Sequence, residues 1–174
     1  TPGSSARCFP SKSSRSASAA APNSCTTPQV NDVGLVGILE PLLEADLCTG
    51  CELCVDACRE EAITMVDGLP QREEDECLLC GDCVSVCPLD AWQTARVGYA
   101  LYVGGKVGRH PQLGAKIAEF IIPEAVPRMV EKIVAFVQAH GNPSERFGVM
   151  LNRTGKSALV EYLDLGAACV ANQR

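Results

Sequence analysis

Two cysteine runs with identical spacing constrain the fold of this 174-residue chain more than any other feature. Both runs read C-x2-C-x2-C-x3-C, and their members are Cys48, Cys51, Cys54 and Cys58 in the first and Cys77, Cys80, Cys83 and Cys87 in the second. Each cysteine of the second run lies 29 residues after its counterpart, and Pro88 follows the last one. Two runs of this spacing are typical of two four-iron clusters, which exchange single electrons.

The ligands of each cluster can be predicted from bacterial two-cluster ferredoxins, in which the fourth cysteine of each run ligates the other cluster. The predicted sets are Cys48, Cys51, Cys54 and Cys87 for cluster 1, and Cys77, Cys80, Cys83 and Cys58 for cluster 2. This exchange joins the two halves, so a small apolar core suffices, with Ile63, Val66, Leu78 and Val84 as its expected members. Gly50 and Gly81 lie inside the loops, where free backbone N–H groups can point at cluster sulfurs and raise the reduction potential.

Structural zinc and disulfides are the alternatives for so many cysteines. Zinc sites use two separated C-x2-C pairs, which two closely spaced triplets match poorly. Disulfides are common in small secreted proteins, but cysteines three residues apart would pair awkwardly. We therefore expect a reducing, cytoplasmic setting, with Cys8, Cys25 and Cys169 outside the two runs.

The composition limits the classes of partner. With 47% hydrophobic and 21% charged residues, the chain is expected to be a soluble globular protein. No apolar stretch approaches the ~20 residues that a membrane helix needs. The formal net charge is −6, so nucleic acid is not expected as a partner, because phosphate binding requires a basic face. An acidic surface suits a basic redox partner instead.

Composition and pattern divide the chain into three segments. Residues 1–29 are rich in Ser, Ala, Pro and Thr, and we expect a disordered tail, a transit peptide or a degenerate remnant there. Residues 30–97 form the predicted ferredoxin domain, with cluster motifs at 48–58 and 77–88. Residues 98–174 are expected to add strands and helices, so the predicted fold class is α+β.

Local patterns predict the individual elements. Apolar runs bounded by turn residues predict three strands, at residues 33–39, 62–66 and 99–103. Apolar faces at helical spacing and capping signals predict three helices, at residues 123–139, from the cap at Asn142 onward, and at 156–163. Pro41 is expected to end the first strand, and Gly108 and Pro111 to keep the segment after the third irregular.

The flanks of the cysteine runs carry three further motifs. They are Pro22-Asn-Ser-Cys25, Asn31-Asp-Val-Gly-Leu-Val-Gly37 and Tyr102-Val-Gly-Gly-Lys-Val-Gly-Arg-His-Pro111. Together with the C-terminal helices, these segments resemble sirohaem-dependent sulfite and nitrite reductases over residues 20–155. The most similar types are the dissimilatory sulfite reductase chains and the catalytic chain of anaerobic sulfite reductase, which carry a two-cluster ferredoxin inside a sirohaem domain.

This resemblance implies a site beyond the two ferredoxin clusters. In the family, a sirohaem coupled to a further four-iron cluster reduces sulfite to sulfide or nitrite to ammonia. Cys25 matches the last cysteine of the family's C-x3-C motif, which implies a ligand of that cluster. Sirohaem contacts are implied for Gly104, Gly105, Lys106 and Arg109. Ala21 stands where the family has another cysteine, so the chain resembles a C-terminal fragment or a degenerate copy.

The resulting hypothesis is an electron-transfer part of a sirohaem-type sulfite or nitrite reductase. Its expected partners are other reductase subunits or a redox donor protein. Catalysis by this chain alone is not expected, because the ligands of the sirohaem-coupled cluster are incomplete. The alternatives are a stand-alone ferredoxin-like electron carrier and a docking subunit without its own substrate site.

Overall fold

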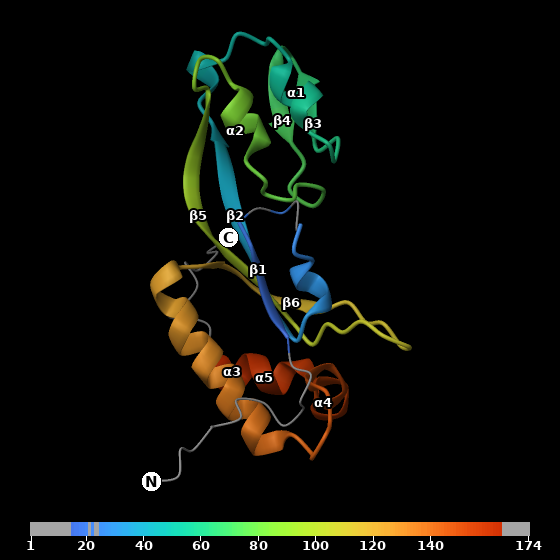
Figure 1. Cartoon of the computed structure of the whole chain (residues 1–174). Coiled ribbons are helices and arrows are strands. Elements are labelled where there is room, and N and C mark those ends of the chain that lie inside the picture. Colours follow the sequence, from blue (N-terminus) through green and yellow to red (C-terminus); the bar gives the residue numbers. More distant parts are fainter. Residues whose placement is uncertain (1–14, 21, 23–24, 165–174) are drawn as a thin grey trace.

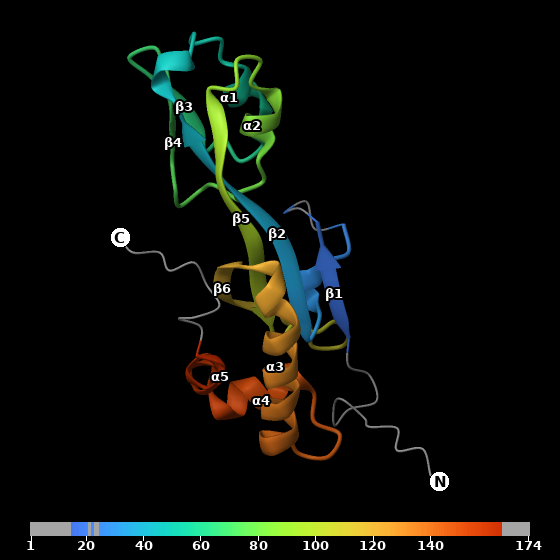
Figure 2. The ribbon, with the colours of Figure 1, turned by 90° about the vertical axis from the view of Figure 1, so that its left-hand side faces the viewer.

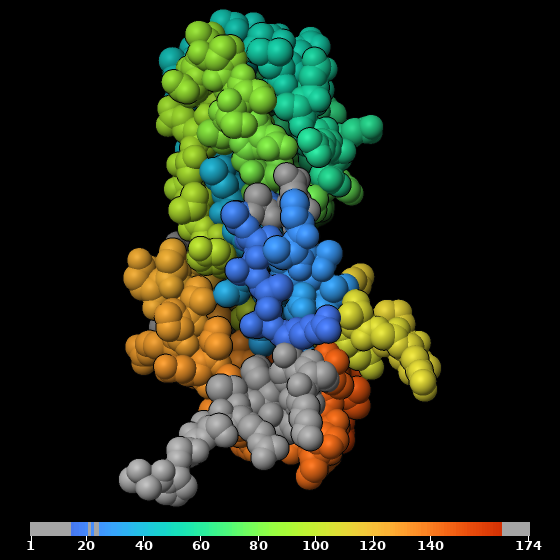
Figure 3. Space-filling model, in the orientation of Figure 1, coloured from blue at the N-terminus to red at the C-terminus, as the bar shows by residue number. Residues whose placement is uncertain are grey.

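The computed structural model describes residues 15–20, 22 and 25–164. A four-stranded sheet carries three helices at one end and a cysteine-rich module at the other (Figure 1). Figure 3 shows these two ends as the opposite poles of an elongated molecule. The mixture of strands and helices confirms the α+β class. Within the described residues, no helix is long and apolar enough to cross a membrane.

One long antiparallel ribbon forms the middle of the sheet. β2 (Val33–Leu43) pairs along its length with β5 (Trp92–Val103), and the strand order is β1-β2-β5-β6. β1 (Ser16–Ala19) is parallel to β2, whereas β6 (Ala115–Ile121) is antiparallel to β5. Figures 1 and 2 show the ribbon extending from the helical end into the cysteine module. The predicted boundary between residues 97 and 98 therefore lies inside β5.

Pro41 lies within β2 and does not end it. The register between β2 and β5 shifts between Glu40 and Pro41, because Glu40 pairs with Arg96 while Pro41 pairs with Thr94. Proline lacks an N–H for the strand ladder and is tolerated where such a bulge interrupts the ladder. The prediction that this strand stops before Pro41 is therefore wrong, and β2 continues to Leu43.

The cysteine module, defined here as residues 44–91, repeats one conformation twice at the 29-residue offset. α1 (Leu53–Ala57) and α2 (Asp82–Val86) are equivalent under this offset. Left-handed backbone also recurs at equivalent positions, which are Gly50 and Leu79, Glu52 and Gly81, and Glu61 and Asp90. Glycine occupies only one member of the first two pairs, so the fold imposes this backbone even on residues with a Cβ.

Each half of the repeat also has a pair of antiparallel strands, and the two pairs are connected differently. β3 (Ile63–Val66) pairs with β4 (Leu69–Arg72), and Met65 opposes Pro70 there. In the other half Thr94 opposes Pro41, at the same positions of the repeat. The first pair is a hairpin closed by Asp67 and Gly68, whereas the second pair continues into the β2–β5 ribbon. The module is thus attached to the sheet through β2 and β5, the two strands that flank it in the sequence.

Three helices cover the other end of the sheet: α3 (Val126–His140), α4 (Phe147–Thr154) and α5 (Lys156–Leu163). Their apolar sides and the sheet enclose the main core, whose most buried side chains include Leu101, Ile121, Ile133, Met150, Leu151 and Leu159. Removal of this apolar surface from water is the main favourable term for packing the helices. The expected apolar face of α3 is confirmed by buried Met129, Ile133 and Val137, and α5 spans the residues predicted for it.

The helix expected from Asn142 starts later. The Asn142 N–H donates to the Glu145 carboxylate at 3.1 Å, which is half of a capping box. Ser144, however, has a φ of 64°, a left-handed value that no helix interior accommodates. The chain therefore makes a turn at these residues, and α4 begins at Phe147.

The structure differs from the sequence expectations in two strands and in the core of the cysteine module. β1 and β6 were not predicted, and β6 occupies a segment expected to be irregular. In the module, Ile63 is buried and Val84 packs against the same core, but Val66 and Leu78 are 41% and 51% exposed, so their assignment to the core is wrong. The core of the module instead includes Trp92, which is 4% exposed.

Candidate iron–sulfur centres

Two hollows in the cysteine module each gather four cysteines. The first hollow is lined by Cys48, Cys51, Cys54 and Cys87. The second hollow is lined by Cys58, Cys77, Cys80 and Cys83. Each hollow thus receives three cysteines from one run and the fourth from the other. The structure brings together the members of each predicted ligand set.

The short helices explain how the cysteines are distributed. Cys54 in α1 and Cys83 in α2 are each 7% exposed and face the interface of the two helices. Cys58 and Cys87 are the C-cap residues of α1 and α2, with extended backbone. Because the chain leaves each helix at this residue, the fourth thiol of a run reaches the hollow formed by the other run.

The walls of the first hollow are mainly apolar. Besides the four cysteines, they include Leu47, Met65, Pro70, Leu89 and Trp92. The hollow measures about 370 Å³ with its open mouth, and the second about 540 Å³. Among the residues that the structure describes, no three His, Cys, Asp or Glu side chains converge on one metal ion. Ligands of a four-iron cluster each bind a different iron, so four thiols around a hollow fit a cluster.

The thiols differ in acidity because their surroundings differ. Burial raises the pKa of the Cys83 thiol to about 12, and burial is also the main cause of the raised pKa of Cys80. Burial alone would raise the pKa of Cys87 as well, but backbone N–H groups of Trp92, Leu89 and Ala91 together lower it. The Ala91 N–H donates to the Cys87 Sγ at 3.2 Å. Backbone donors therefore favour the thiolate form of Cys87.

Gly104 and Gly105 lie inside the protein, where packing accounts for both glycines. Gly104 has a φ of 78°, and its Cα lies against α4. A Cβ on Gly105 would overlap the carbonyl oxygen of Gln29. Both residues are buried, and the implied sirohaem contacts of these glycines stay a prediction.

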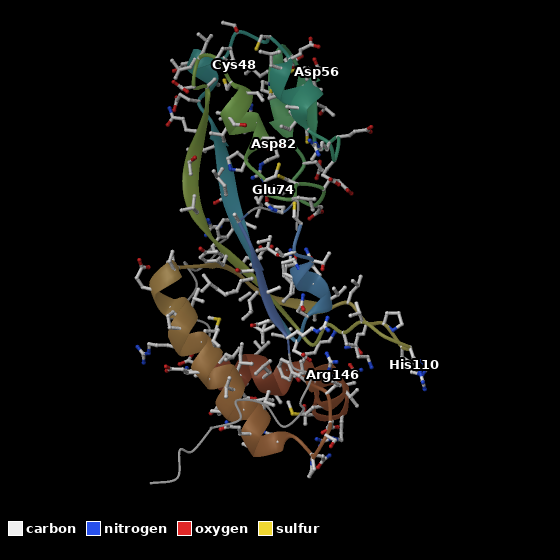
Figure 4. The ribbon with its side chains drawn as sticks, viewed as in Figure 1. Cys48, Asp56, Glu74, Asp82, His110 and Arg146 are labelled. Carbon is white, nitrogen blue, oxygen red and sulfur yellow. The ribbon has the colours of Figure 1, made fainter. Side chains whose placement is uncertain are left out.

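The other residues implied by the resemblance are more accessible. Lys106 and Gln112 form an isolated antiparallel β-bridge through their backbones at the base of a projecting loop, and Arg109 is exposed on that loop. His110 marks the tip of the loop in Figure 4. Cys25 is exposed and lines neither hollow. Cys8, Ala21 and Cys169 lie outside the described residues.

The sequence patterns did not identify four residues that line the hollows, which are Trp92, Met65, Pro41 and Pro70. Trp92, Met65 and Pro70 line the first hollow, and Pro41 lines the second. The signal that could have found them is the 29-residue repeat, which extends beyond the cysteines to the pairs Pro41 and Pro70 and Ile63 and Trp92. Spacing alone does not show that equivalent residues approach the two hollows.

Comparison with known proteins places this architecture among reductases. Residues 9–168 match the family described as the nitrite and sulphite reductase 4Fe-4S domain. The coenzyme F420-dependent sulfite reductase of Methanocaldococcus jannaschii is 31% identical over 141 residues, which are 80% of this chain and 23% of that protein. The beta subunit of the dissimilatory-type sulfite reductase of Archaeoglobus fulgidus is 27% identical over 160 residues, covering 82% of this chain and 43% of that protein.

A solved structure shows the same fold. The crystal structure of dissimilatory sulfite reductase I superposes with a TM-score of 0.66 at 18% identity, covering 96% of this chain and 46% of that one. The chain spans less than half the length of each of these proteins. The sequence match extends over both flanks of the cysteine module and over the module itself. The chain belongs to the nitrite and sulphite reductase 4Fe-4S domain family.

Proposed function

We propose that this chain relays single electrons through two four-iron clusters to a sulfite or nitrite reduction site. The observation that carries the proposal is the grouping of eight cysteines into two four-thiol hollows with exchanged fourth members. Each cluster supplies a one-electron couple when bound. The thiols hold the clusters, the apolar walls limit access of water, and the ribbon positions the module relative to the sheet.

Electrons are proposed to enter at the first hollow. Figure 4 shows Cys48 and Asp56 at the outer end of the module, away from the sheet. Leu47, Leu53 and Leu89 line this hollow and are 44%, 46% and 48% exposed. An exposed apolar rim around a redox centre is suited to a docked donor protein.

The second hollow is proposed as the exit because it lies beside the sheet. Asp82 and Glu74 mark this side of the module in Figure 4. Pro22 and Pro41 line the second hollow, and Cys80 shares a surface groove with Gly37 and Tyr99 of the ribbon. The Leu39 N–H also donates to the Leu79 carbonyl at 2.8 Å, which ties the cysteine loop to β2.

Charge is distributed unevenly along the molecule. Residues 30–97 contain 15 of the 21 acidic residues but only three of the 15 basic ones. The remaining segments are therefore net basic. This polarity favours a basic donor at the module and an anionic group, such as a sirohaem carboxylate or sulfite, near Lys106 and Arg109.

Reversing one charge at the entry face is expected to slow electron uptake. Glu52 is exposed and lines the first hollow. Because complementary charge accelerates encounter, Glu52→Lys should lower the rate of reduction by reduced methyl viologen, a cationic donor, several-fold at low ionic strength. The difference should disappear at high salt. Glu161→Lys on α5 is the matched control, and an equal effect of both changes would contradict entry at the first hollow.

Acid is expected to release iron from the second hollow at a higher pH than from the first. Cys83, with its pKa raised to about 12 by burial, and Cys80 recapture protons more readily than Cys87, whose pKa is lowered. A protonated thiol no longer ligates metal, so the second hollow should lose its iron before the first as the pH falls. Stepwise anaerobic acidification, followed by electron paramagnetic resonance of both clusters, measures the order. Loss of iron from the first hollow at a higher pH than from the second would contradict this prediction.

The direct test of the function is anaerobic reconstitution with iron, sulfide and sirohaem. We expect about eight irons in the module, as two four-iron clusters require. Sirohaem bands and sulfite- or nitrite-dependent oxidation of reduced viologen would identify the reduction site. Eight irons without sirohaem would favour the alternative of an electron carrier that serves another reductase subunit. A colourless protein that holds zinc would refute both.

A further inference from the structure

Trp92 is the single tryptophan of the chain, and it lines the first hollow. Its side chain belongs to the module core, with Cys54 and Cys87 among its neighbours in that cluster. The residue is 4% exposed. Its Nε1 is buried and has no hydrogen-bond partner among the described residues. The indole N–H is only a donor, so it requires an acceptor.

A buried N–H without an acceptor is rare and destabilises the folded protein. The walls of this hollow include the apolar side chains of Leu47, Met65, Pro70 and Leu89. Thr49 and Glu52 also line the hollow, but neither side chain accepts a hydrogen bond from Nε1. The other acceptors at this hollow are the sulfurs of its four cysteines and of the group that these cysteines would hold. Sulfur accepts hydrogen bonds from N–H groups in iron–sulfur sites.

We propose that the Trp92 Nε1–H donates a hydrogen bond to a sulfur of the four-iron cluster in the first hollow and thereby raises its reduction potential. This inference rests on the proposed occupancy of that hollow. The physical reason is electrostatic: reduction adds negative charge to the cluster, and a donor aimed at its sulfurs stabilises the reduced form more than the oxidised form.

The internal repeat makes this contribution unequal between the two clusters. Ile63 is the counterpart of Trp92 at the 29-residue offset, and it lines the second hollow. An isoleucine side chain has no donor. The two hollows have the same number of thiols and related backbone, so the indole N–H is a side-chain difference that separates the two potentials.

The first test is Trp92→Phe, which keeps an aromatic ring in the core and removes the donor group. In a redox titration followed by electron paramagnetic resonance, the potential of the first cluster should become more negative while that of the second stays unchanged. Loss of one hydrogen bond is expected to change the reduction equilibrium by up to about tenfold, which is 59 mV for one electron. Leu43→Val is the matched control, because Leu43 pairs with Trp92 and packs against the same core but lines neither hollow.

The second test needs no variant and uses the fact that the chain has one tryptophan. Protein containing tryptophan labelled with ¹⁵N at the indole is reduced, and electron–nuclear double resonance is recorded. A ¹⁵N coupling, together with a proton coupling that vanishes in D₂O, supports the hydrogen bond. Full iron content with no such coupling and an unchanged potential in Trp92→Phe would overturn it. Failure to bind iron in the first hollow would instead overturn the proposed function.

Discussion

Replacing Cys87 by alanine is expected to remove the proposed cluster of the first hollow, whose other proposed ligands come from the first run. Cys87 lies 29 residues after Cys58 in the repeat but lines the hollow of Cys48, Cys51 and Cys54. A four-iron cluster that loses one of four thiolates is expected to lose iron or to convert to a three-iron form. The protein should therefore lose one set of cluster signals and its electron relay, while the other cluster is retained.

The informative comparison is between variants of different runs. If fourth ligands are exchanged, Cys87→Ala and Cys51→Ala should remove the same signal, and Cys58→Ala should remove the signal that depends on Cys77. If each run holds its own cluster, Cys87→Ala should instead remove the same signal as Cys77→Ala. Ser85→Ala, at an exposed α2 position, is the control for the substitution itself. Iron analysis and electron paramagnetic resonance of the reduced proteins distinguish these patterns.

Removing Arg146 is expected to destabilise the protein by about 3–5 kcal/mol, because it leaves a buried carboxylate without its counter-charge. Asp32 is 1% exposed, and its Oδ2 accepts hydrogen bonds from the Arg146 guanidinium at 3.1 Å and from the Arg15 backbone N–H at 2.8 Å. Figure 4 shows Arg146 at the helical end of the molecule. The pair joins the residue before β2 to the start of α4, so Arg146→Ala should loosen the helices from the sheet.

Chemical denaturation of Arg146→Ala, Asp32→Ala and the double variant measures this effect. The double variant should lose less stability than the sum of the two single changes, because neither charge is then left alone. Lys116→Ala provides the exposed comparison. Its ion pair with Glu119 has partners 51% and 38% exposed and is expected to contribute about 0–1 kcal/mol. A cost for Arg146→Ala no larger than for Lys116→Ala would contradict the role of the buried pair.

The ribbon explains how an electron-transfer module can be added to a second domain without a flexible linker. Both strands are continuous from the module to the sheet, so the module cannot rotate about a single chain connection. Arg96 reinforces the region beside the bulge. It pairs with Glu40 across the ribbon at 2.5 Å and lies over the Phe120 ring of β6 at 3.8 Å. A fixed position is useful for electron transfer, because the rate depends on the separation of the centres.

The same region explains why β6 was not predicted. Phe120 has a φ of 53°, which is unusual for a bulky residue, and β6 has register shifts against β5. Gly98 of β5 lies against it, and a Cβ on Gly98 would lie 2.7 Å from the Phe120 Cα. The irregular backbone of β6 is thus accepted because β5 has glycine at the contact. Neither residue signals a strand in isolation, because the contact joins segments that are distant in sequence.

Residue patterns alone were enough to identify the family and the helices α3 and α5, and they predict the redox chemistry and its eight candidate ligands. These depend on spacing of 29 residues or less, or on apolar periodicity within one helix, and both are local properties. The three-dimensional fold was needed to show which end of the sheet carries the module, where β1 and β6 pair, and which hollow receives Cys58 and Cys87. It also showed that Trp92 and Ile63, equivalent in the repeat, give two similar hollows different hydrogen-bonding capacity. The physical reason is that burial and hydrogen-bond satisfaction depend on contacts between distant segments, which spacing along the chain does not specify.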